Sequence, residues 1–378
     1  MATPRQNLHH IYQQALQAVA GDRAVAKHLH NNKLTGLWYL IAIGKAAAAM
    51  TQGALAELQL IRGLVISKHH HIDAALYEDT RLNCIESNHP VPGDASFEAG
   101  EALINFINQL PDDAQCLFLI SGGTSSLVEV LAPNCTKSDM QELTEHLLAN
   151  AYSIQQINAK RQKLSRIKGG GLWQFLQQRK VHALLISDVP NDDPAIIGSG
   201  LLFPSDTAAF FTWQICASST IACQAAAQAA KELGYSVFLQ TQFLECDAVE
   251  AGNLIADTLK QAAPGIYIWG AETTVQLPTN SGKGGRNQHL ALAAAIAIEN
   301  QPQLYILAAA TDGTDGLTDD AGGLVDGQTV ARGRLKGFDP TAELANANSN
   351  IFLAASGDLL HTGVTGTNVM DFIIAIKL

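Results

Sequence analysis

Two loops in the sequence pair glycine with residues that can bind anions. Gly44-Lys45 follows the apolar residues 37–43, and residues 121–126 follow the apolar residues 116–120. Glycines let a backbone approach an anion closely, and the start of a helix supplies free N–H groups and a positive dipole. The alternative is that the hydroxyl groups only cap a tight turn. We expect a phosphate or carboxylate cradle formed by Ser121, Gly122, Gly123, Thr124 and Ser125.

Two cationic side chains accompany these glycines. Lys45 lies in the first turn of an expected helix, where it opposes the helix dipole at a cost of about 0.3–1 kcal/mol. A bound anion would offset that cost, whereas a lysine that reaches into solvent needs no anion. Arg286, in the glycine-rich residues 282–287, offers a planar fork that suits a carboxylate or phosphate. With Glu272 and Asn287 it makes a second candidate oxyanion site, the alternative being a solvated loop.

Two further loops are rich in aspartate. The first contains Asp188 and Asp193, and the second spans residues 311–320 and contains Asp312 and Asp315. Such carboxylates can hold Mg²⁺ through one or two oxygens while water and substrate phosphates complete its shell. The spacing in the second loop does not fit the alternating ligands of an EF-hand. Helix-start chemistry in the first loop and Asx turns in the second are the alternatives.

The elements that position these loops alternate between strand and helix. Strand, loop, helix and strand in this order indicate βαβ units, hence α/β domains with mainly parallel sheets covered by helices. Ligands of such sheets bind beyond the carboxyl ends of the strands, where these loops lie. Residues 6–29 predict one or two amphipathic helices. In the second half we expect helices at 218–233, 248–262 and 289–299, and strands at 235–239, 265–269, 271–277 and 303–310.

The composition predicts two domains. A single core seldom grows beyond about 250–300 residues, and this chain has 378. Hydrophobic residues make up 47% of it, which excludes intrinsic disorder. We expect a larger Rossmann-like domain at residues 1–210 and a smaller domain at 211–378, whose last segment packs back on the first.

Several classes of protein are disfavoured. The net charge of −11 argues against nucleic-acid and anionic-membrane partners, and no apolar run approaches about 18 residues. The six cysteines form no C-x-x-C pair, and the opening residues do not resemble a signal peptide, so we expect a cytoplasmic protein. Motifs of P-loop nucleotide binding, standard dinucleotide binding, common serine hydrolases and zinc proteases do not occur.

Taken together, these segments resemble the type II glycerate kinases, the glycerate 2-kinases of the MOFRL family. The resemblance runs in order from about residue 6 to residue 378. The matching segments are Gly44-Lys45, residues 88–92, 121–125, 158–161, 164–171, 187–189, Asp192-Asp193, residues 272–275, 284–288, 311–316, 362–363 and 365–368.

The resemblance implies ATP- and Mg²⁺-dependent transfer of a phosphoryl group to the 2-hydroxyl of D-glycerate, or of a closely related hydroxy acid. It implies two α/β domains with the active site in the cleft between them. The proposed catalytic residues of the family correspond to Lys45 and Arg286, and Asp188 and Asp193 would serve the metal. His89 and Lys168 lie in matching segments and are further candidates, and a second copy of the chain is a candidate partner.

The sequence also departs from the family pattern. Asn191 stands where glycine is usual, Leu201-Leu202 where Pro-Thr is usual, Val364 where proline is usual, and Met370 where asparagine is usual. We expect the bulky leucines to change acceptor or nucleotide preference. Two other functions stay open at this point: a reductase acting on hydroxypyruvate, as relatives have been labelled, and a non-catalytic sugar-acid binding protein.

Overall fold

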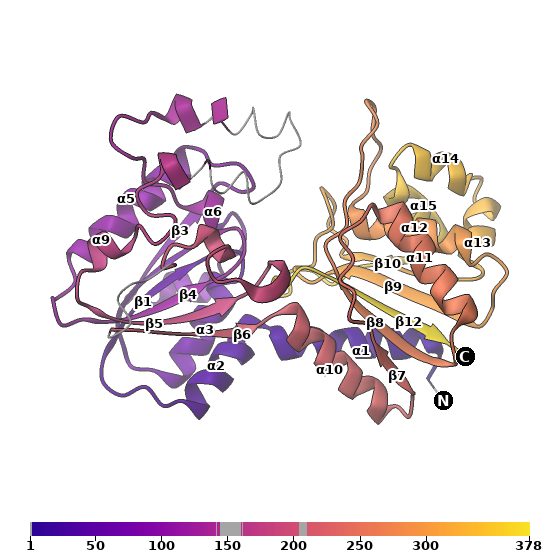
Figure 1. Ribbon diagram of the computed structural model, residues 1–378, viewed down its shortest axis with the longest axis horizontal. Helices are drawn as coiled ribbons and strands as arrows, with labels where there is room; N and C mark the ends of the chain where they lie inside the picture. The colour runs from indigo at the N-terminus through magenta and orange to yellow at the C-terminus, as the bar shows by residue number, and fades with distance from the viewer. Residues whose placement is uncertain (1, 141, 144–159, 161, 204–209) are drawn as a thin grey trace. The chain divides into compact units, whose positions relative to one another are not determined.

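The computed structural model describes residues 2–140, 142–143, 160, 162–203 and 210–378, which form two units (Figure 1). The N-terminal unit comprises Ala20–Ser218 and Gly366–Asn368, and the C-terminal unit comprises the remainder of the chain. The cut predicted between residues 210 and 211 differs from this division in three places. Residues 211–218 belong to the N-terminal unit because they contain a strand of its sheet, and residues 2–19 group with the C-terminal unit. Of the last segment, which was expected to pack back on the first domain, only Gly366–Asn368 does so, because Val369–Leu378 contains a strand of the second sheet.

The N-terminal unit is built on a six-stranded sheet in the order β3-β2-β1-β4-β5-β6, with all neighbouring strands parallel. Its strands are β1 (Trp38–Ile43), β2 (Leu60–Lys68), β3 (Leu82–Ser87), β4 (Gln115–Ile120), β5 (Lys180–Ile186) and β6 (Phe211–Ala217). The two edge strands, β3 and β6, were not predicted. Both are partly exposed and mix polar with apolar residues, so they lack the continuous apolar run of a buried parallel strand.

Helices cover both faces of this sheet, as Figure 1 shows. The helices on one face are α2 (Gly21–Asn31) and α3 (Ala47–Glu57). The helices on the other side are α5 (Asp94–Asn108), α6 (Thr124–Leu127) and α9 (Trp173–Leu176), and a short helix, α4 (Ala74–Glu78), contacts the edge strand β3. This arrangement confirms the predicted α/β fold for the N-terminal unit.

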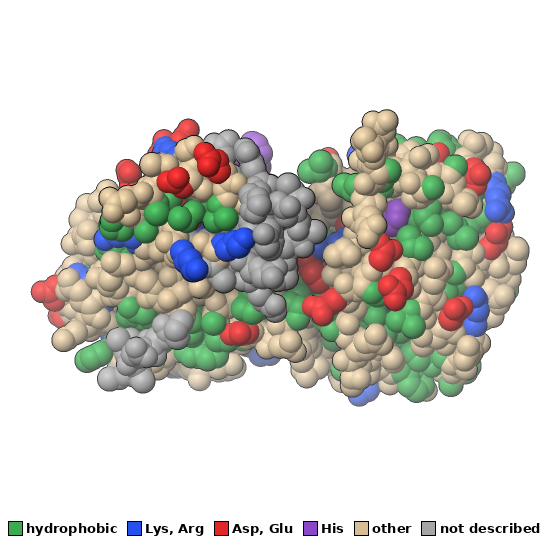
Figure 2. Space-filling model, turned by 45° about the horizontal axis from the view of Figure 1, so that its top comes forward, with side chains coloured by type: hydrophobic (Ala, Val, Ile, Leu, Met, Phe, Trp, Pro, Cys, Tyr) green, Lys and Arg blue, Asp and Glu red, His purple; other side chains and the backbone are tan. Residues whose placement is uncertain are grey.

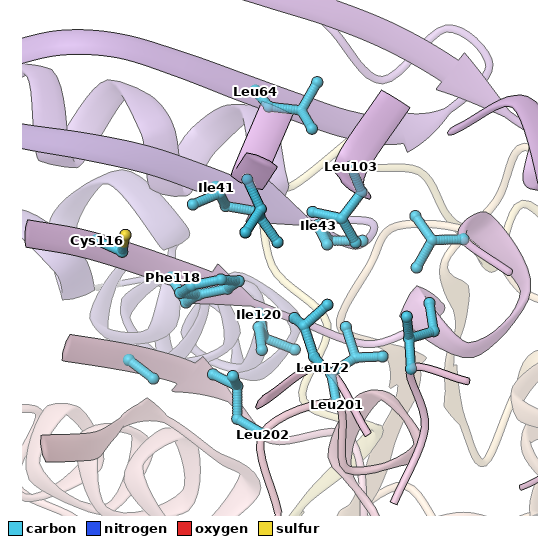
Figure 3. Close-up of a cluster of buried hydrophobic side chains, with 14 of the residues drawn as sticks. Ile41, Ile43, Leu64, Leu103, Cys116, Phe118, Ile120, Leu172, Leu201 and Leu202 are labelled. Atoms are coloured by element: carbon cyan, nitrogen blue, oxygen red, sulfur yellow. The ribbon is translucent and has the colours of Figure 1, made fainter. Parts of the chain in front are cut away.

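The core of the N-terminal unit includes two residues that we expected to act on specificity. Leu201 and Leu202 are fully buried beside Phe118 and Ile120 (Figure 3). Their side chains therefore fill the core instead of lining a ligand site. The structure favours a packing role for this departure from the family pattern over a change in substrate preference.

The C-terminal unit contains a second six-stranded sheet, in the order β11-β10-β9-β12-β8-β7. Its strands are β7 (Val237–Leu239), β8 (Gly265–Ala271), β9 (Leu304–Ala310), β10 (Gly322–Asp326), β11 (Leu359–Leu360) and β12 (Asp371–Lys377). Its helices are α1 (Pro4–Val19), α10 (Ser219–Glu232), α11 (Ala248–Gln261), α12 (Arg286–Ala297), α13 (Thr329–Leu335), α14 (Pro340–Ala345) and α15 (Ser349–Ser356). The two α/β units confirm the predicted architecture.

The second sheet departs from the mainly parallel arrangement that was expected. Among the described strands, β7, β8, β9 and β11 share a direction, but β10 and β12 run the opposite way between them. Only the β7–β8 pair is parallel within this described sheet. Two antiparallel pairs arise because the last strand of the chain enters between β8 and β9, which no local sequence pattern indicates. The other two arise because β10 runs against its neighbours β9 and β11.

Two local expectations were wrong. Residues 272–277 do not form a strand, because β8 continues to Ala271 and only Thr274 makes an isolated bridge beyond it. The helix expected after the loop at residues 121–126 is only a single turn, because α6 ends at Leu127. Glu272 therefore lies directly beyond the carboxyl end of a buried strand, and α6 is too short to provide a strong helix dipole.

The surface of the described residues is mixed in charge. On the face shown in Figure 2, Lys and Arg side chains are scattered among Asp and Glu side chains. Within the described ranges, every helix is too short or too polar to cross a bilayer.

Candidate functional site

Loops after β1, β3 and β4 bring Lys45, His89 and Gly123 together. A Cβ atom built on Gly123 would lie 3.1 Å from His89 Nε2 and 3.2 Å from Lys45 Cγ. The φ of Gly123 is +85°, so both the conformation and the close approach favour glycine. The amide of Lys45 also donates a hydrogen bond to the carbonyl oxygen of Gly122 at 2.9 Å. The structure thus joins residues that were predicted from separate motifs.

Gly122 brings a carboxylate and an amide to the same loop. A Cβ atom on Gly122 would lie 2.1 Å from Asp188 Oδ2 and 2.4 Å from Asn368 Nδ2. Any larger residue would have to displace both side chains. Asp188, from the loop after β5, and Asn368, from the segment before β12, therefore pack directly on the glycine backbone beside Lys45.

The hydroxyl groups of this loop are used within the fold. The Ser121 hydroxyl accepts a hydrogen bond from the Ala46 amide at 3.1 Å. The Thr124 hydroxyl lies 2.9 Å from the carbonyl oxygen of Ile43 and 2.7 Å from that of Ser121. These bonds tie the β4–α6 loop to the end of β1. Ser121 and Thr124 thus position the glycines instead of facing a ligand.

Other groups of the loop remain available to an anion. Within the described part of the chain, the amides of Gly122 and Gly123 donate no hydrogen bond. Ser125 is half-buried, and its hydroxyl has no hydrogen-bond partner among those same residues. The predicted cradle therefore reduces to two backbone amides and one hydroxyl in a loop that contacts the Lys45 side chain, an arrangement that suits a small oxyanion.

The second predicted metal carboxylate, Asp193, has a local role. Its Oδ1 accepts a hydrogen bond from the Ala195 amide at 2.9 Å, which closes the turn after the 3₁₀ helix Pro190–Asp192. Asn191 in that helix has a φ of +64°, which explains why glycine is usual there, since asparagine is one of the few other residues that tolerate it. Among the described residues, no group of three or more His, Cys, Asp or Glu could hold a metal.

Lys168 is placed away from solvent. Its ammonium forms an ion pair with Glu129, and both side chains are fully buried. The next two residues bind a third segment, because the amides of Gly169 and Gly170 donate hydrogen bonds to the carbonyl oxygens of Ser199 and Gly200. Lys168 therefore joins three segments of the N-terminal unit, which favours a structural role over contact with substrate.

In the C-terminal unit, Arg286 lies between two carboxylates. Its Nε is 2.6 Å from Asp371 Oδ2, and its Nη2 donates to Asp371 Oδ1 at 3.0 Å. Its Nη1 donates to Glu272 Oε1 at 2.5 Å. Burial opposes the charge of Arg286, but the two carboxylates outweigh it and raise its pKa. Arg286 is therefore a permanent cation whose fork is already engaged.

The start of α12 is capped by Asp315 from the loop after β9. Its Oδ1 accepts a hydrogen bond from the Asn287 amide at 3.1 Å, and its Oδ2 accepts one from the Gln288 amide at 2.8 Å. The side-chain amide of Asn287 also donates to Asp315 at 3.3 Å. Burial and the nearby Asp371 raise the pKa of Asp315 to about 7, although these bonds oppose the shift. The positive end of α12 is thus occupied by a side chain of the protein.

Asp312 lies near the same group of carboxylates. Its Oδ1 accepts hydrogen bonds from the amide and the hydroxyl of Thr314 at 3.1 and 3.2 Å, which is the Asx turn that was the alternative to a metal-binding loop. Burial, and then the charges of Asp312 and Asp371, raise the pKa of Tyr12. The first helix therefore packs against the acidic side of the Arg286 cluster.

Sequence reasoning missed two residues of the site, Asn368 and Asp371. Asn368 was part of a matching motif but was given no role, and Asp371 was not considered. A signal for Asp371 was present: a carboxylate directly precedes the apolar run of β12, where an unpaired charge would be costly. Such a residue needs a cationic partner, and Arg286 supplies it.

Two family models match this chain. One, described as a domain of unknown function (DUF4147), matches residues 7–233, and the other, described as the MOFRL family, matches residues 265–371. Together they cover both units of the structure.

Relatives match nearly the whole chain. The D-glycerate 2-kinase of Thermotoga maritima is 35% identical over 97% of this chain and 96% of its own length. The glycerate 2-kinase of Pyrococcus horikoshii is 31% identical over 97% of this chain and 93% of its own length. A crystal structure of glycerate kinase from Thermotoga maritima superposes with a TM-score of 0.90 at 34% identity, covering 99% of both chains.

Proposed function

The chain belongs to the MOFRL family of glycerate kinases, and we propose that it transfers the γ-phosphoryl group of ATP to the 2-hydroxyl of D-glycerate. The products would be 2-phosphoglycerate and ADP. The observation that carries this proposal is the close contact of Lys45 with the Gly122–Gly123 backbone at the carboxyl edge of a parallel sheet. Phosphoryl transfer depends mostly on positioning and charge neutralisation, which these groups supply.

Lys45 is proposed to stabilise the transferring phosphoryl group. Its ammonium is a compact point charge, and its backbone is fixed by the hydrogen bond to Gly122. Charge on the equatorial oxygens of a phosphoryl group is spread in the transition state, so a cation placed there lowers the barrier. The amides of Gly122 and Gly123 would support the same oxygens.

Arg286 is proposed to bind the carboxylate of the acceptor. Its planar fork suits a carboxylate better than a moving phosphoryl oxygen. Asp371 holds the fork through Nε and Nη2, which leaves Nη1 on the more exposed side with Glu272. Arg286 would therefore contribute mainly to the affinity for the acceptor.

We also propose Mg²⁺ as the partner of ATP, with Asp188 as its protein ligand. Asp188 fits this role because its carboxylate packs on a glycine where a Cβ would displace it. Mg²⁺ usually takes only one or two protein carboxylates and keeps water and phosphate oxygens in its shell. Bound there, the ion would neutralise phosphate charge. The local hydrogen bond of Asp193 to Ala195 makes Asp193 the weaker candidate.

Formation of ADP tests the proposal. The protein is incubated with ATP and D-glycerate, with and without Mg²⁺, and the phosphorylated product is identified by NMR. We expect 2-phosphoglycerate only when all three components are present. Turnover without a divalent metal would contradict the role of Mg²⁺, and no turnover with any small 2-hydroxy acid would contradict the kinase assignment.

A second incubation with NADH and hydroxypyruvate tests the alternative. The sequence lacks the dinucleotide-binding motif G-x-G-x-x-G at the start of a βαβ unit, so we expect no oxidation of NADH. Rapid oxidation would identify a reductase instead, and binding of glycerate without either reaction would identify a binding protein.

A further inference from the structure

The two carboxylates that contact Arg286 differ in how firmly they are held. The side chain of Asp371 is 1% exposed and contacts two nitrogens of the guanidinium. The side chain of Glu272 is 30% exposed and contacts one nitrogen of the guanidinium, Nη1. A buried charge that lost its partner would be strongly destabilising, whereas a partly exposed carboxylate can exchange its partner for water.

The backbone positions add to this difference. Asp371 is the first residue of β12 and is paired on both sides, with Ala271 of β8 and Ala310 of β9. Glu272 lies one residue beyond the end of β8. Its amide donates to the carbonyl oxygen of Leu244, which fixes the backbone of Glu272, while rotation about its side-chain bonds can still move the carboxylate. One partner of Arg286 is thus immobile and the other can move away.

We propose that Glu272 occupies, in the ligand-free protein, the position on Arg286 that the carboxylate of the acceptor takes when it binds. This inference rests on the proposed role of Arg286 as the acceptor-binding cation. Binding exchanges one ionised carboxylate for another, without proton or electron transfer. Asp371 keeps the guanidinium oriented throughout, and is a positioning residue.

This exchange has a consequence for selectivity. When Glu272 moves away, Arg286 loses a negatively charged partner. A carboxylate ligand replaces that negative charge, whereas a neutral ligand does not. Glu272 therefore lowers the affinity for every ligand but penalises neutral ligands most. Removing its charge should strengthen anion binding to Arg286 and weaken the preference for anions.

The test uses Glu272→Gln, which keeps the shape of the side chain and removes its charge. Affinities for D-glycerate and, separately, for inorganic sulfate are measured by calorimetry on the full-length protein. We expect both anions to bind about 3–10-fold more tightly, as suits the loss of one partly exposed competing charge. The matched control is Glu245→Gln, an exposed carboxylate on the neighbouring segment, which makes the same change in net charge.

A double variant shows whether the gain acts through Arg286. In an Arg286→Ala background, Glu272→Gln should leave the affinity unchanged, because the cation for which Glu272 competes is absent. An equal gain in both backgrounds, or in Glu245→Gln, would show a general charge effect and overturn the proposal. Weaker anion binding in Glu272→Gln would show that Glu272 holds Arg286 in place, and would also overturn it.

Asp371 is tested by Asp371→Asn, with the fold checked by circular dichroism. We expect at least about 10-fold weaker binding of both anions, because the fork loses its fixed partner. Unchanged affinity in a folded variant would overturn the positioning role. Sulfate separates this inference from the kinase assignment, since its Arg286-dependent affinity can be measured whether or not glycerate is phosphorylated.

Discussion

The two cationic centres of this protein are built from different groups. Lys45 in the N-terminal unit lies against the glycine backbone of Gly122 and Gly123, on which the Asp188 carboxylate also packs. Arg286 in the C-terminal unit lies between the carboxylates of Asp371 and Glu272. The first centre combines a cation and a carboxylate with backbone amides, whereas the second engages the cation directly with two carboxylates.

The different surroundings of the two cations suit them to different roles. A site that combines a cation with unpaired amides gains most when negative charge develops near it, which suits a transition state. A cation that is already paired gains less from a new anion, because it must give up a partner. It serves better to select and orient a ligand that carries its own charge. The comparison leads to four predictions.

The largest effect is expected for Lys45→Ala. Loss of the ammonium should lower kcat by about 10²–10³, the range seen when one oxyanion donor is removed, and should change the acceptor KM much less. Steady-state kinetics at saturating MgATP with varied D-glycerate measure both constants. Lys33→Ala, which removes an exposed lysine of the same unit, is the control. A change in acceptor KM alone would show that the roles of the two cations are reversed.

Arg286→Ala should act mainly on binding. We expect the acceptor KM to rise about 10²-fold, at least as much as kcat falls, since a carboxylate contact contributes to substrate and transition state alike. The same assay measures it, with the exposed Arg334→Ala as the control for loss of an arginine. If kcat falls while KM stays constant, Arg286 contacts the phosphoryl group and the comparison between the two centres fails.

The pH dependence of stability should differ between the two units. His182 stacks on His28 at 5.5 Å between ring centroids, and burial, then His28 and Lys180, lower the pKa of His182 to about 4. The unfolded chain therefore binds a proton at His182 more readily than the folded protein does. The stability that comes from the neutral, buried His182 is complete above about pH 6.5 and is lost as the pH falls towards 4. Between these two pH values the free energy of unfolding should fall by about 3 kcal/mol, and His182→Gln should make this fall smaller.

In the C-terminal unit, Asp315 should make stability change with pH in the opposite direction. Its pKa is raised to about 7, so its contribution is complete below about pH 4 and is lost as the pH rises through 7. Hydrogen exchange, followed separately in the two units between pH 4 and 8, measures both slopes. Asp315→Asn should flatten the slope of the C-terminal unit alone, and equal slopes in the two units of the parent protein would contradict the prediction.

The smallest effect is expected at Asn191, beside the first centre. Its φ of +64° costs a residue with a Cβ about 1–2 kcal/mol, less for asparagine and least for glycine. We expect Asn191→Ala to lower the free energy of unfolding by about 1 kcal/mol and Asn191→Gly to leave it nearly unchanged. Denaturant titration measures both values. Equal losses in the two variants would indicate that the asparagine side chain, and not its backbone, matters.

Much of the N-terminal unit could be predicted from the sequence. The buried strands β1, β2, β4 and β5 contain continuous apolar runs, and β1, β4 and β5 are each followed by a loop that carries the residue types of a site. Parallel strands bring their carboxyl ends to one edge, so Lys45, Gly123 and Asp188 could be expected near one another. The edge strands were missed because half-exposed strands need no continuous apolar pattern.

The C-terminal unit was less predictable for a physical reason. β12 is an apolar run at the end of the chain, but its neighbours are strands that lie far earlier in the sequence. The local sequence of β12 does not indicate between which two strands it inserts. The partnership of Asp371 with Arg286 follows from that insertion, so it could not be expected either.

The order of residues along the chain suffices to predict the local features of the site: glycine loops after apolar strands, a lysine and an arginine for anions, and the family motifs. Which of those polar groups can still contact a ligand depends on how distant segments pack together. Ser121 and Thr124 bind the end of β1, Leu201 and Leu202 fill the core, and Arg286 already has two carboxylate partners. The reason is that hydrogen bonds and burial are satisfied between segments distant in the sequence, and only packing shows which polar groups are left for a ligand.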